Sequence, residues 1–275
     1  MTTWVLVGCG YTGERLARTL VARGDDVVAA RRNPNAVERL VADVGVRAVR
    51  SDLALPDTLV DLVPPGAIVV VLAPPGPDPA GEIRALLDAA RSAKRIVYVS
   101  STGVYGRGHG QWVDESAPLS PLSPSGEARV AAEAALATSS ISHVALRVAG
   151  IYGPDRGIAD RIRLGQYRVI GDGTSHISRI HVDDLVAVII AAGESDATGA
   201  INVADDEPSP IGEVANAVAA AIGVAPPVRT PVEQVPPEVA AMLTADRKIA
   251  NARMKALGVV LRHPSWRTSL VAARD

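Results

Sequence analysis

The sequence predicts an α/β fold in which a parallel sheet is covered by helices on both faces. Short apolar runs rich in Val and Ile alternate with amphipathic helical stretches through most of the chain. A glycine-rich turn joins the first apolar run to the first helix. The chain has 275 residues, of which 48% are hydrophobic, so it can bury a substantial core. Because it contains no Phe, we expect Val, Leu, Ile and Ala to fill that core.

The glycine turn follows a strand at Trp4–Val7 and precedes a helix with Leu16 and Leu20 on one face. In this context glycines have separate uses: one allows the tight turn, one lets a pyrophosphate approach the backbone, and one lets helix and strand pack closely. The phosphates then face the helix N-terminus and its positive dipole end. The pattern favours dinucleotide binding over an ordinary turn, and the residues involved are Gly8, Gly10, Tyr11, Thr12 and Gly13.

The second strand, expected at Asp26–Ala30, indicates which dinucleotide is bound. Folds that prefer NAD place an acid at the end of this strand to bond the ribose hydroxyls, whereas arginine there suits a 2′-phosphate. Arg31 and Arg32 follow the strand and no acid does. We therefore expect NADP, with NAD as a possible alternative and a pair of solvated surface arginines as the other interpretation.

The remaining pattern extends the sheet. A helix over Ala36–Val44 leads to a third strand at Arg47–Arg50, and a continuous apolar run at Ala67–Leu72 is typical of a central parallel strand. The later expected elements are a helix at Ala80–Ser92, a strand at Arg95–Val99, a helix from Ser123–Pro124 to about Thr138, a strand at Val144–Val148, a helix ending near Ala192 and a strand at Ile201–Val203.

The domain organisation follows from these patterns. Residues 1–154 are expected to form a dinucleotide-binding domain. Residues 155–275 are expected to form mainly a smaller, proline-rich cap that binds the substrate, with residues 176–205 returning to the first domain.

Charge and cysteine content restrict the partners. The net charge of −2 gives no reason to expect nucleic acid or an anionic membrane. Cys9 is the single cysteine, which excludes an internal disulfide and a cysteine-based zinc site. No basic and apolar leader precedes Trp4, and no apolar run approaches the ~20 residues that span a bilayer. We expect a soluble cytoplasmic protein that acts on a small molecule.

Five short motifs, taken in order, resemble those of the extended short-chain dehydrogenase/reductases, the NAD(P)-dependent epimerase/dehydratase group. They are Gly8-x-Gly10-x-x-Gly13, Asp52-Leu53, Ser101-Thr102-Gly103-Val104-Tyr105-Gly106, Leu146-Arg147-x-x-x-Ile151-Tyr152-Gly153-Pro154 and His181-Val182-Asp183-Asp184. The resemblance covers nearly the whole chain. It implies a Rossmann-type sheet with a C-terminal cap, and family habit implies a homodimer.

The resemblance also implies roles for particular residues. Asp52, with Leu53, would bind the adenine, and Ala73 would line the cofactor cleft. Thr102, or its neighbour Ser101, would hydrogen-bond the reacting oxygen of the substrate. From the residues alone, Asp52 could instead cap the next turn, and the hydroxyls could satisfy backbone groups at a strand end.

The family's usual Tyr-x-x-x-Lys pair is absent. Aligned on Glu133, the chain has Ser125 at the tyrosine position and Arg129 at the lysine position. An aliphatic hydroxyl is a far poorer acid than a phenol, whereas Arg129 could still hold ribose or phosphate. This departure resembles the atypical branch of the family. Three explanations stay open: Tyr105 or Tyr152 supplies the phenol, Thr102 and Ser125 relay a proton through water, or the protein binds NADP without turnover.

The other polar residues predict less. His181 with Asp183 and Asp184 could suggest a metal, but acids in the first turn of a helix suit its dipole, so we expect a structural role and no metal. Arg179 and Arg163 are compatible with an anionic substrate such as a nucleotide-sugar phosphate, and equally with a role as surface arginines. The sequence thus favours an NAD(P)-dependent oxidoreductase or epimerase acting on a small carbonyl or sugar-nucleotide substrate, with a non-catalytic NADP-binding sensor or scaffold as the alternative.

Overall fold

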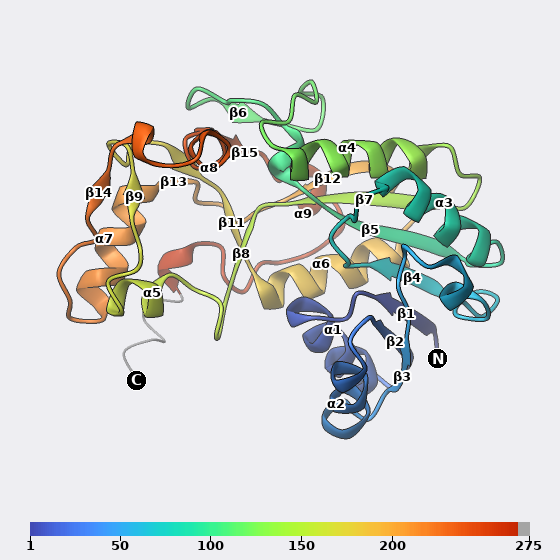
Figure 1. Cartoon of the computed structure of the whole chain (residues 1–275). Coiled ribbons are helices and arrows are strands. Elements are labelled where there is room, and N and C mark those ends of the chain that lie inside the picture. Colours follow the sequence, from blue (N-terminus) through green and yellow to red (C-terminus); the bar gives the residue numbers. More distant parts are fainter. Residues whose placement is uncertain (269–275) are drawn as a thin grey trace. The chain divides into compact units, whose positions relative to one another are not determined.

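A computed structural model describes residues 1–268 and divides the chain into two compact units (Figure 1). The first unit contains residues 1–100, 127–146 and 186–201, and the second contains 101–126, 147–185 and the described residues from 202 onward. Residues 101–126 and 147–154, which were expected in the dinucleotide-binding domain, lie in the second unit. Residues 186–201 lie in the first unit, inside the range 176–205 for which a return was expected.

The central sheet has seven strands in the order β12-β7-β5-β4-β1-β2-β3. The pairs β1–β2, β2–β3, β1–β4 and β4–β5 are all parallel. This confirms the predicted α/β fold with a doubly wound parallel sheet. The strands are β1 (Thr3–Val7), β2 (Asp26–Arg31), β3 (Arg47–Arg50), β4 (Ile68–Val71), β5 (Arg95–Ser101), β7 (His143–Val148) and β12 (Gly199–Val203).

Helices cover both faces of this sheet: α3 and α4 lie on one face, and α1 and α6 lie on the other (Figure 1). Strand alternation explains the two layers, because successive side chains point to opposite faces. Val5 and Val7 pack with Leu86 of α3 and Leu136 of α4. Trp4 faces α6, where a side chain in place of Gly193 would begin 2.6 Å from the indole. The helices are α1 (Tyr11–Ala22), α2 (Pro34–Val44), α3 (Pro79–Ala89), α4 (Pro124–Ala137) and α6 (Val182–Glu194).

The helix ends agree with local sequence signals. Asn33 caps α2 by accepting a hydrogen bond from the Ala36 N–H, and Asp78 caps α3 in the same way through the Gly81 N–H. Each of these helices has Pro at its first position, where a missing N–H costs nothing. The Ser123 hydroxyl likewise accepts from the Gly126 N–H at the start of α4, as the Ser-Pro pair predicted.

The second unit is built from short pairings and helices. The pairs are β8–β11, β9–β14 and β6–β15, all parallel, and β10–β13, which is antiparallel. Its helices α5 and α7 pack around Ile162, Val214 and Trp266. Its elements are β6 (Trp112–Val113), β8 (Gly150–Tyr152), α5 (Ala159–Arg163), β9 (Val169–Ile170), β10 (His176–Ile177), β11 (Arg179–His181), β13 (Ser209–Pro210), α7 (Ile211–Ala221), β14 (Arg229–Thr230), α8 (Pro237–Leu243), β15 (Lys248–Ile249) and α9 (Ala252–Lys255).

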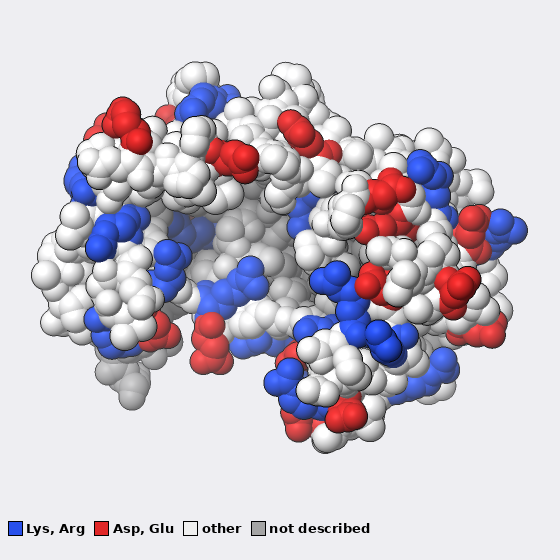
Figure 2. Space-filling model, in the orientation of Figure 1, with Lys and Arg blue, Asp and Glu red and all other residues white. Residues whose placement is uncertain are grey.

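Acidic and basic side chains are interspersed on the face shown in Figure 2, in keeping with the small net charge. Across residues 1–268, no helix has both the length and the apolar character that a membrane crossing requires.

A buried cation ties β5 to the end of α6. Arg95 is 2% exposed, and its guanidinium donates to the carbonyls of Ala192 and Ala197 and to the Ser142 hydroxyl. Each end of this guanidinium therefore has a polar partner, which offsets the cost of removing the charge from water.

Replacing Arg95 with Met should destabilise the protein by about 3 kcal/mol, because two buried carbonyls and a hydroxyl lose their donors. Chemical denaturation followed by circular dichroism measures the difference. The matched control is Arg91→Met, since the Arg91 side chain is 78% exposed and pairs with Asp88 on the surface. Equal unfolding midpoints for the two variants would contradict the assignment.

Candidate nucleotide-binding site

Two glycines at the turn between β1 and α1 lie against neighbouring groups that leave little or no space for a side chain. Gly8 has φ +85°, and a Cβ there would lie 2.4 Å from the backbone nitrogen of Ala73, which follows β4. A Cβ on Gly13 would come within 3.1 Å of both the Cys9 sulfur and the Leu72 side chain. Gly8 thus permits close approach of two strand ends, and Gly13 permits the helix to pack on the sheet, as predicted from the motif.

The N-terminus of α1 lies open to a ligand. Gly10 is its N-cap residue, and no side chain of the described residues caps the first turn. Uncapped first-turn amides, together with the helix dipole, form a binding site for phosphate groups. The turn therefore has the geometry that pyrophosphate binding requires.

A cavity of about 360 Å³ opens beside this turn, entirely within the first unit. Its wall includes most of the residues expected to hold a dinucleotide: Gly8, Gly10, Arg31, Arg32, Asp52, Leu53 and Ala73. It also includes residues that sequence reasoning missed, namely Asn33, Ser51, Pro74, Gly76 and Glu82. The carboxyl ends of β1, β2, β3 and β4 meet here, which is where open parallel sheets bind ligands.

The two arginines at the end of β2 differ in their surroundings. The Arg31 guanidinium donates to the Cys9 carbonyl at 2.7 Å, and its Nη1 would lie 2.9 Å from a Cβ on Gly10. Arg31 therefore lies across the glycine turn. Arg32 is exposed at the rim of the cavity. Both cations are placed where an anionic group entering the cavity would meet them.

Two residues after β3 contribute polar groups. One oxygen of Asp52 accepts the Ala54 N–H at 3.1 Å, so this carboxylate caps its own turn while it lines the cavity. The Ser51 hydroxyl is buried and has no hydrogen-bond partner in the described structure. A buried hydroxyl of this kind loses hydrogen-bonding energy until a ligand supplies a partner. The glycine cradle, the arginines and this hydroxyl all fit a dinucleotide.

Glu82 and Cys9 complete the surroundings of the cavity. Glu82 is 6% exposed and accepts the Gly76 N–H at 2.8 Å, which fixes the loop after β4. Cys9 is fully buried, and burial raises the pKa of its thiol to about 12. The thiol therefore stays protonated and serves as a small packing group.

The hydroxyl-rich segment at the end of β5 contains one hydroxyl that no protein group engages. Ser100 donates to the Glu133 carboxylate at 2.5 Å, and Ser101 accepts the Gly103 N–H at 3.0 Å. The half-buried Thr102 hydroxyl makes no hydrogen bond within residues 1–268. Thr102 is thus better placed than Ser101 to bond a substrate oxygen.

The phenol of Tyr105 is enclosed in the second unit. It donates to the Asn202 side chain at 2.7 Å and accepts from Arg147 at 2.9 Å. Tyr105 is 1% exposed, and burial raises its pKa, with Arg147 partly opposing that change. This network favours the interpretation of Tyr105 as a packing residue over that of a proton donor.

The two residues at the expected Tyr and Lys positions lie in different surroundings. Ser125 is exposed in the first turn of α4, and the Arg129 guanidinium donates to the Val99 carbonyl at 2.8 Å. Arg129 is not among the residues that line the cavity. It faces Tyr98, a buried phenol of β5 whose pKa burial raises to about 12. Tyr98 is thus a poor proton donor near neutral pH.

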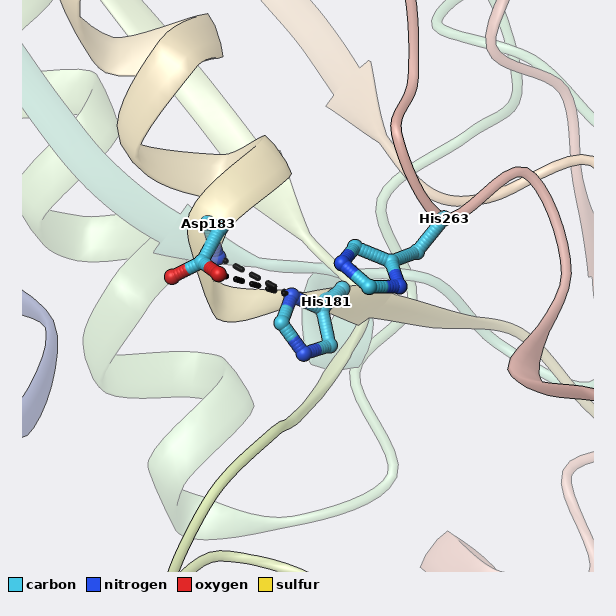
Figure 3. Close-up of side chains that lie close together, drawn as sticks. All are labelled: His181, Asp183 and His263. Carbon is cyan, nitrogen blue, oxygen red and sulfur yellow. Dashed lines mark hydrogen bonds and ion pairs between the residues drawn. The ribbon is translucent and has the colours of Figure 1, made fainter. Parts of the chain in front are cut away.

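The structure places a second histidine, His263, beside His181, which sequence reasoning did not bring to this position (Figure 3). The His263 ring stacks on the His181 ring with centroids 3.7 Å apart, and Asp183 lies near both. However, His181 Nδ1 already accepts the Asp183 N–H at 3.2 Å. Asp184 holds the Arg262 and His263 amides. The nitrogen lone pairs of an imidazole lie in the plane of its ring, so those of two stacked rings do not converge on one metal ion. The arrangement therefore favours a structural role.

The fold and the cavity define a dinucleotide-binding protein, and comparison with known proteins gives its family. Residues 8–193 match the NAD(P)H-binding family, so the chain belongs to that family, within the extended short-chain dehydrogenase/reductase fold. It is 33% identical to 3-diazoavenalumate denitrifying reductase from a Streptomyces species, over 98% of this chain and 99% of that protein.

Two further proteins are similar to this chain over most of its length. The chain is 29% identical to 2-alkyl-3-oxoalkanoate reductase of Stenotrophomonas maltophilia, over 81% of this chain and 76% of that one. A conserved protein of unknown function from Silicibacter pomeroyi has the same fold, with a TM-score of 0.84 and 30% identity over 99% of this chain and 98% of that one.

Because its thiol is buried and protonated, Cys9 should not react with a disulfide reagent in the native protein at pH 8. In guanidinium the same reagent should titrate one thiol per chain, since Cys9 is the only cysteine. Spectrophotometric thiol titration measures both values. A native reaction as fast as the denatured one would show that the thiol is accessible and the turn open.

Proposed function

We propose that this protein is an NADP-dependent reductase that acts on the carbonyl group of a small substrate. The observation that carries the proposal is the cavity at the carboxyl ends of β1 to β4, where a glycine turn meets Arg31 and Arg32 and no acid follows β2. Two cations at this position match a 2′-phosphate. The reductases among its relatives support the direction of the reaction.

The residues divide the work as follows. Gly8, Gly10 and the N-terminus of α1 would hold the pyrophosphate, Arg31 and Arg32 the 2′-phosphate, and Asp52 the adenine. The bound nicotinamide supplies a hydride. Thr102 would donate a hydrogen bond to the carbonyl oxygen, which draws electrons from the carbon and stabilises the alkoxide as it forms.

The proton that completes the alcohol needs a source other than the usual tyrosine. Tyr105 is enclosed, the Tyr152 hydroxyl is buried, and the Tyr98 pKa is raised to about 12, so none of these phenols supports proton donation. Water bonded to Thr102, with or without Ser125, is the source that the hydroxyls support best. The names of two relatives, an avenalumate reductase and an oxoalkanoate reductase, are consistent with a substrate that also bears a carboxylate.

One observation keeps a second function in view. Ser125 and Arg129 replace the catalytic pair, and the Arg129 guanidinium is occupied by the Val99 carbonyl. A protein that binds NADP and does not turn it over would also have these features. Cofactor binding is common to both functions, and turnover separates them.

Replacing Arg31 and Arg32 together with Ala should weaken NADPH binding by 10- to 100-fold and NADH binding by less than about threefold, because only NADPH carries the 2′-phosphate. Isothermal titration calorimetry measures both. Arg47→Ala is the matched control, since Arg47 is exposed at the opposite end of β3.

Gly10→Asp tests the rest of the site in the same titrations. Its Cβ would lie 2.9 Å from the Arg31 guanidinium, and its carboxylate would repel phosphate, so both nucleotides should fail to bind. Equal losses of NADPH and NADH in the double arginine variant would refute the NADP preference. Normal binding by Gly10→Asp would refute the assignment of the turn.

Thr102→Val should lower kcat for carbonyl reduction by about 10- to 100-fold and leave the NADPH Kd unchanged, because it removes a hydrogen bond made to the reacting oxygen. The assay follows NADPH absorbance with a substrate found by screening 3-oxo acids and aromatic ketones. Ser116→Ala is the control, since the exposed Ser116 hydroxyl donates to the neighbouring Asp114 carboxylate. Full activity of Thr102→Val would eliminate this role, and the failure of every carbonyl compound would favour the non-catalytic function.

A further inference from the structure

Arg179, on β11 in the second unit, has an arrangement unlike that of the structural arginine Arg95. Its guanidinium makes a single hydrogen bond within the described residues, to the Ile177 carbonyl at a long 3.4 Å. Arg95 has three partners for its own guanidinium. A guanidinium carries five N–H donors, so most donors of Arg179 have no protein acceptor although the residue is half-buried. A half-buried cation with unused donors can bind an anion through them.

The groups around Arg179 form one cluster. Tyr167, Asp205 and Tyr152 all lie close enough to its guanidinium to influence its pKa. Both tyrosines are half-buried, so part of each residue remains accessible. Asp205 is 1% exposed, and its Oδ1 accepts the Glu207 N–H at 3.3 Å. No ion pair between Arg179 and Asp205 is found within residues 1–268, although the charge of each shifts the pKa of the other.

Asp205 is held in an unusual state. Its Oδ2 is buried and has no hydrogen-bond partner in the described structure. The pKa of this carboxyl is raised to about 8: burial is the largest cause and the charges of Glu207 and Asp206 add to it, while the hydrogen bond from the Glu207 amide and the charge of Arg179 oppose it. Asp205 is therefore mostly protonated near pH 7 and does not neutralise Arg179.

We propose that Arg179 binds the carboxylate of the substrate, with the rings of Tyr152 and Tyr167 against its apolar or aromatic portion. This assignment rests on the proposed reductase function and names the class of its substrate, an aromatic or unsaturated carboxylic acid that also bears the reducible group. A carboxylate matches the planar guanidinium fork through two parallel hydrogen bonds. It also brings one negative charge, which one arginine balances.

A phosphate group fits these surroundings less well. It would bring up to two negative charges, and the acidic residues Asp206 and Glu207 already lie close enough to Asp205 to raise its pKa. Arg161, whose guanidinium lies 5.4 Å from the centre of the Tyr167 ring, is exposed, so its charge is screened by solvent. The cluster therefore favours the monoanion.

The test uses the full chain loaded with NADPH and three probes of similar shape: cinnamate, its neutral amide cinnamamide, and phenyl phosphate. Calorimetry at pH 6.5 should show cinnamate binding at least tenfold more tightly than either other probe. Arg179→Gln should abolish that preference. Arg163→Gln is the matched control, because Arg163 of α5 is exposed and paired with Asp160, and it should behave as the wild type.

The pH dependence gives an independent readout. Below pH 8 the protonated Asp205 tolerates an adjacent carboxylate and can donate a hydrogen bond to it. As pH rises through 8, Asp205 ionises and repels the ligand, so cinnamate affinity should fall at least threefold between pH 6.5 and 9. Asp205→Asn, which keeps an oxygen for the Glu207 N–H, should remove this dependence.

Several results would overturn the proposal. They are the absence of saturable cinnamate binding, equal affinity for cinnamate and cinnamamide, unchanged cinnamate affinity in Arg179→Gln, an equal loss in Arg163→Gln, or tighter Arg179-dependent binding of phenyl phosphate. Comparison of the three probes on the wild type needs no variant to fold. NADPH titration of each protein reports separately on the proposed function, so a chain that binds NADPH but fails these tests refutes only the carboxylate site.

Discussion

The close approach of two backbone segments is the constraint on which the nucleotide site depends. Gly8 at the end of β1 and Ala73 after β4 lie so near each other that a single added carbon would come within 2.4 Å of the Ala73 nitrogen. Parallel strands that end at the same level create a crevice, and its depth is set by how closely the segments leaving them can pass. With a larger residue at Gly8, the turn would move outward and α1 would lose its position.

The two units carry different kinds of chemistry. The first contains the buried parallel sheet and the nucleotide site, where the N-terminus of α1, which no side chain caps, lies beside Arg31 and Arg32. The second carries Thr102, the enclosed Tyr105 network and the Arg179 cluster. Its pairings are two or three residues long, and its hydrogen-bond networks link segments far apart in sequence. Polar networks of this kind fix loop positions where no long strand or helix does so.

The sequence predicted the sheet well because buried parallel strands are local apolar runs. β3 was predicted with its observed bounds, and the glycine turn contained enough information to locate most of one wall of the cavity. Asn33, Ser51 and Glu82 could not be assigned in advance, because their roles depend on how the ends of separate strands and helices meet. The stacking of His263 on His181 was missed for the same reason. The strands of the second unit are only two or three residues long, too short for a periodic pattern in the sequence, and they are recognised by the strands with which they pair.

The division of the chain has a consequence for biosynthesis. The strands β1 to β5 leave the ribosome early, yet the sheet remains without its edge strand β12 until residue 203 has been made. Much of the second unit is translated in the interval. Until then β7 has no strand paired on its outer side, and an unpaired strand edge of this kind is a surface that chaperones shield. Arg95, which binds the end of α6, can donate to the Ala197 carbonyl only after residue 197 has been synthesised. This contact of the first unit therefore forms late.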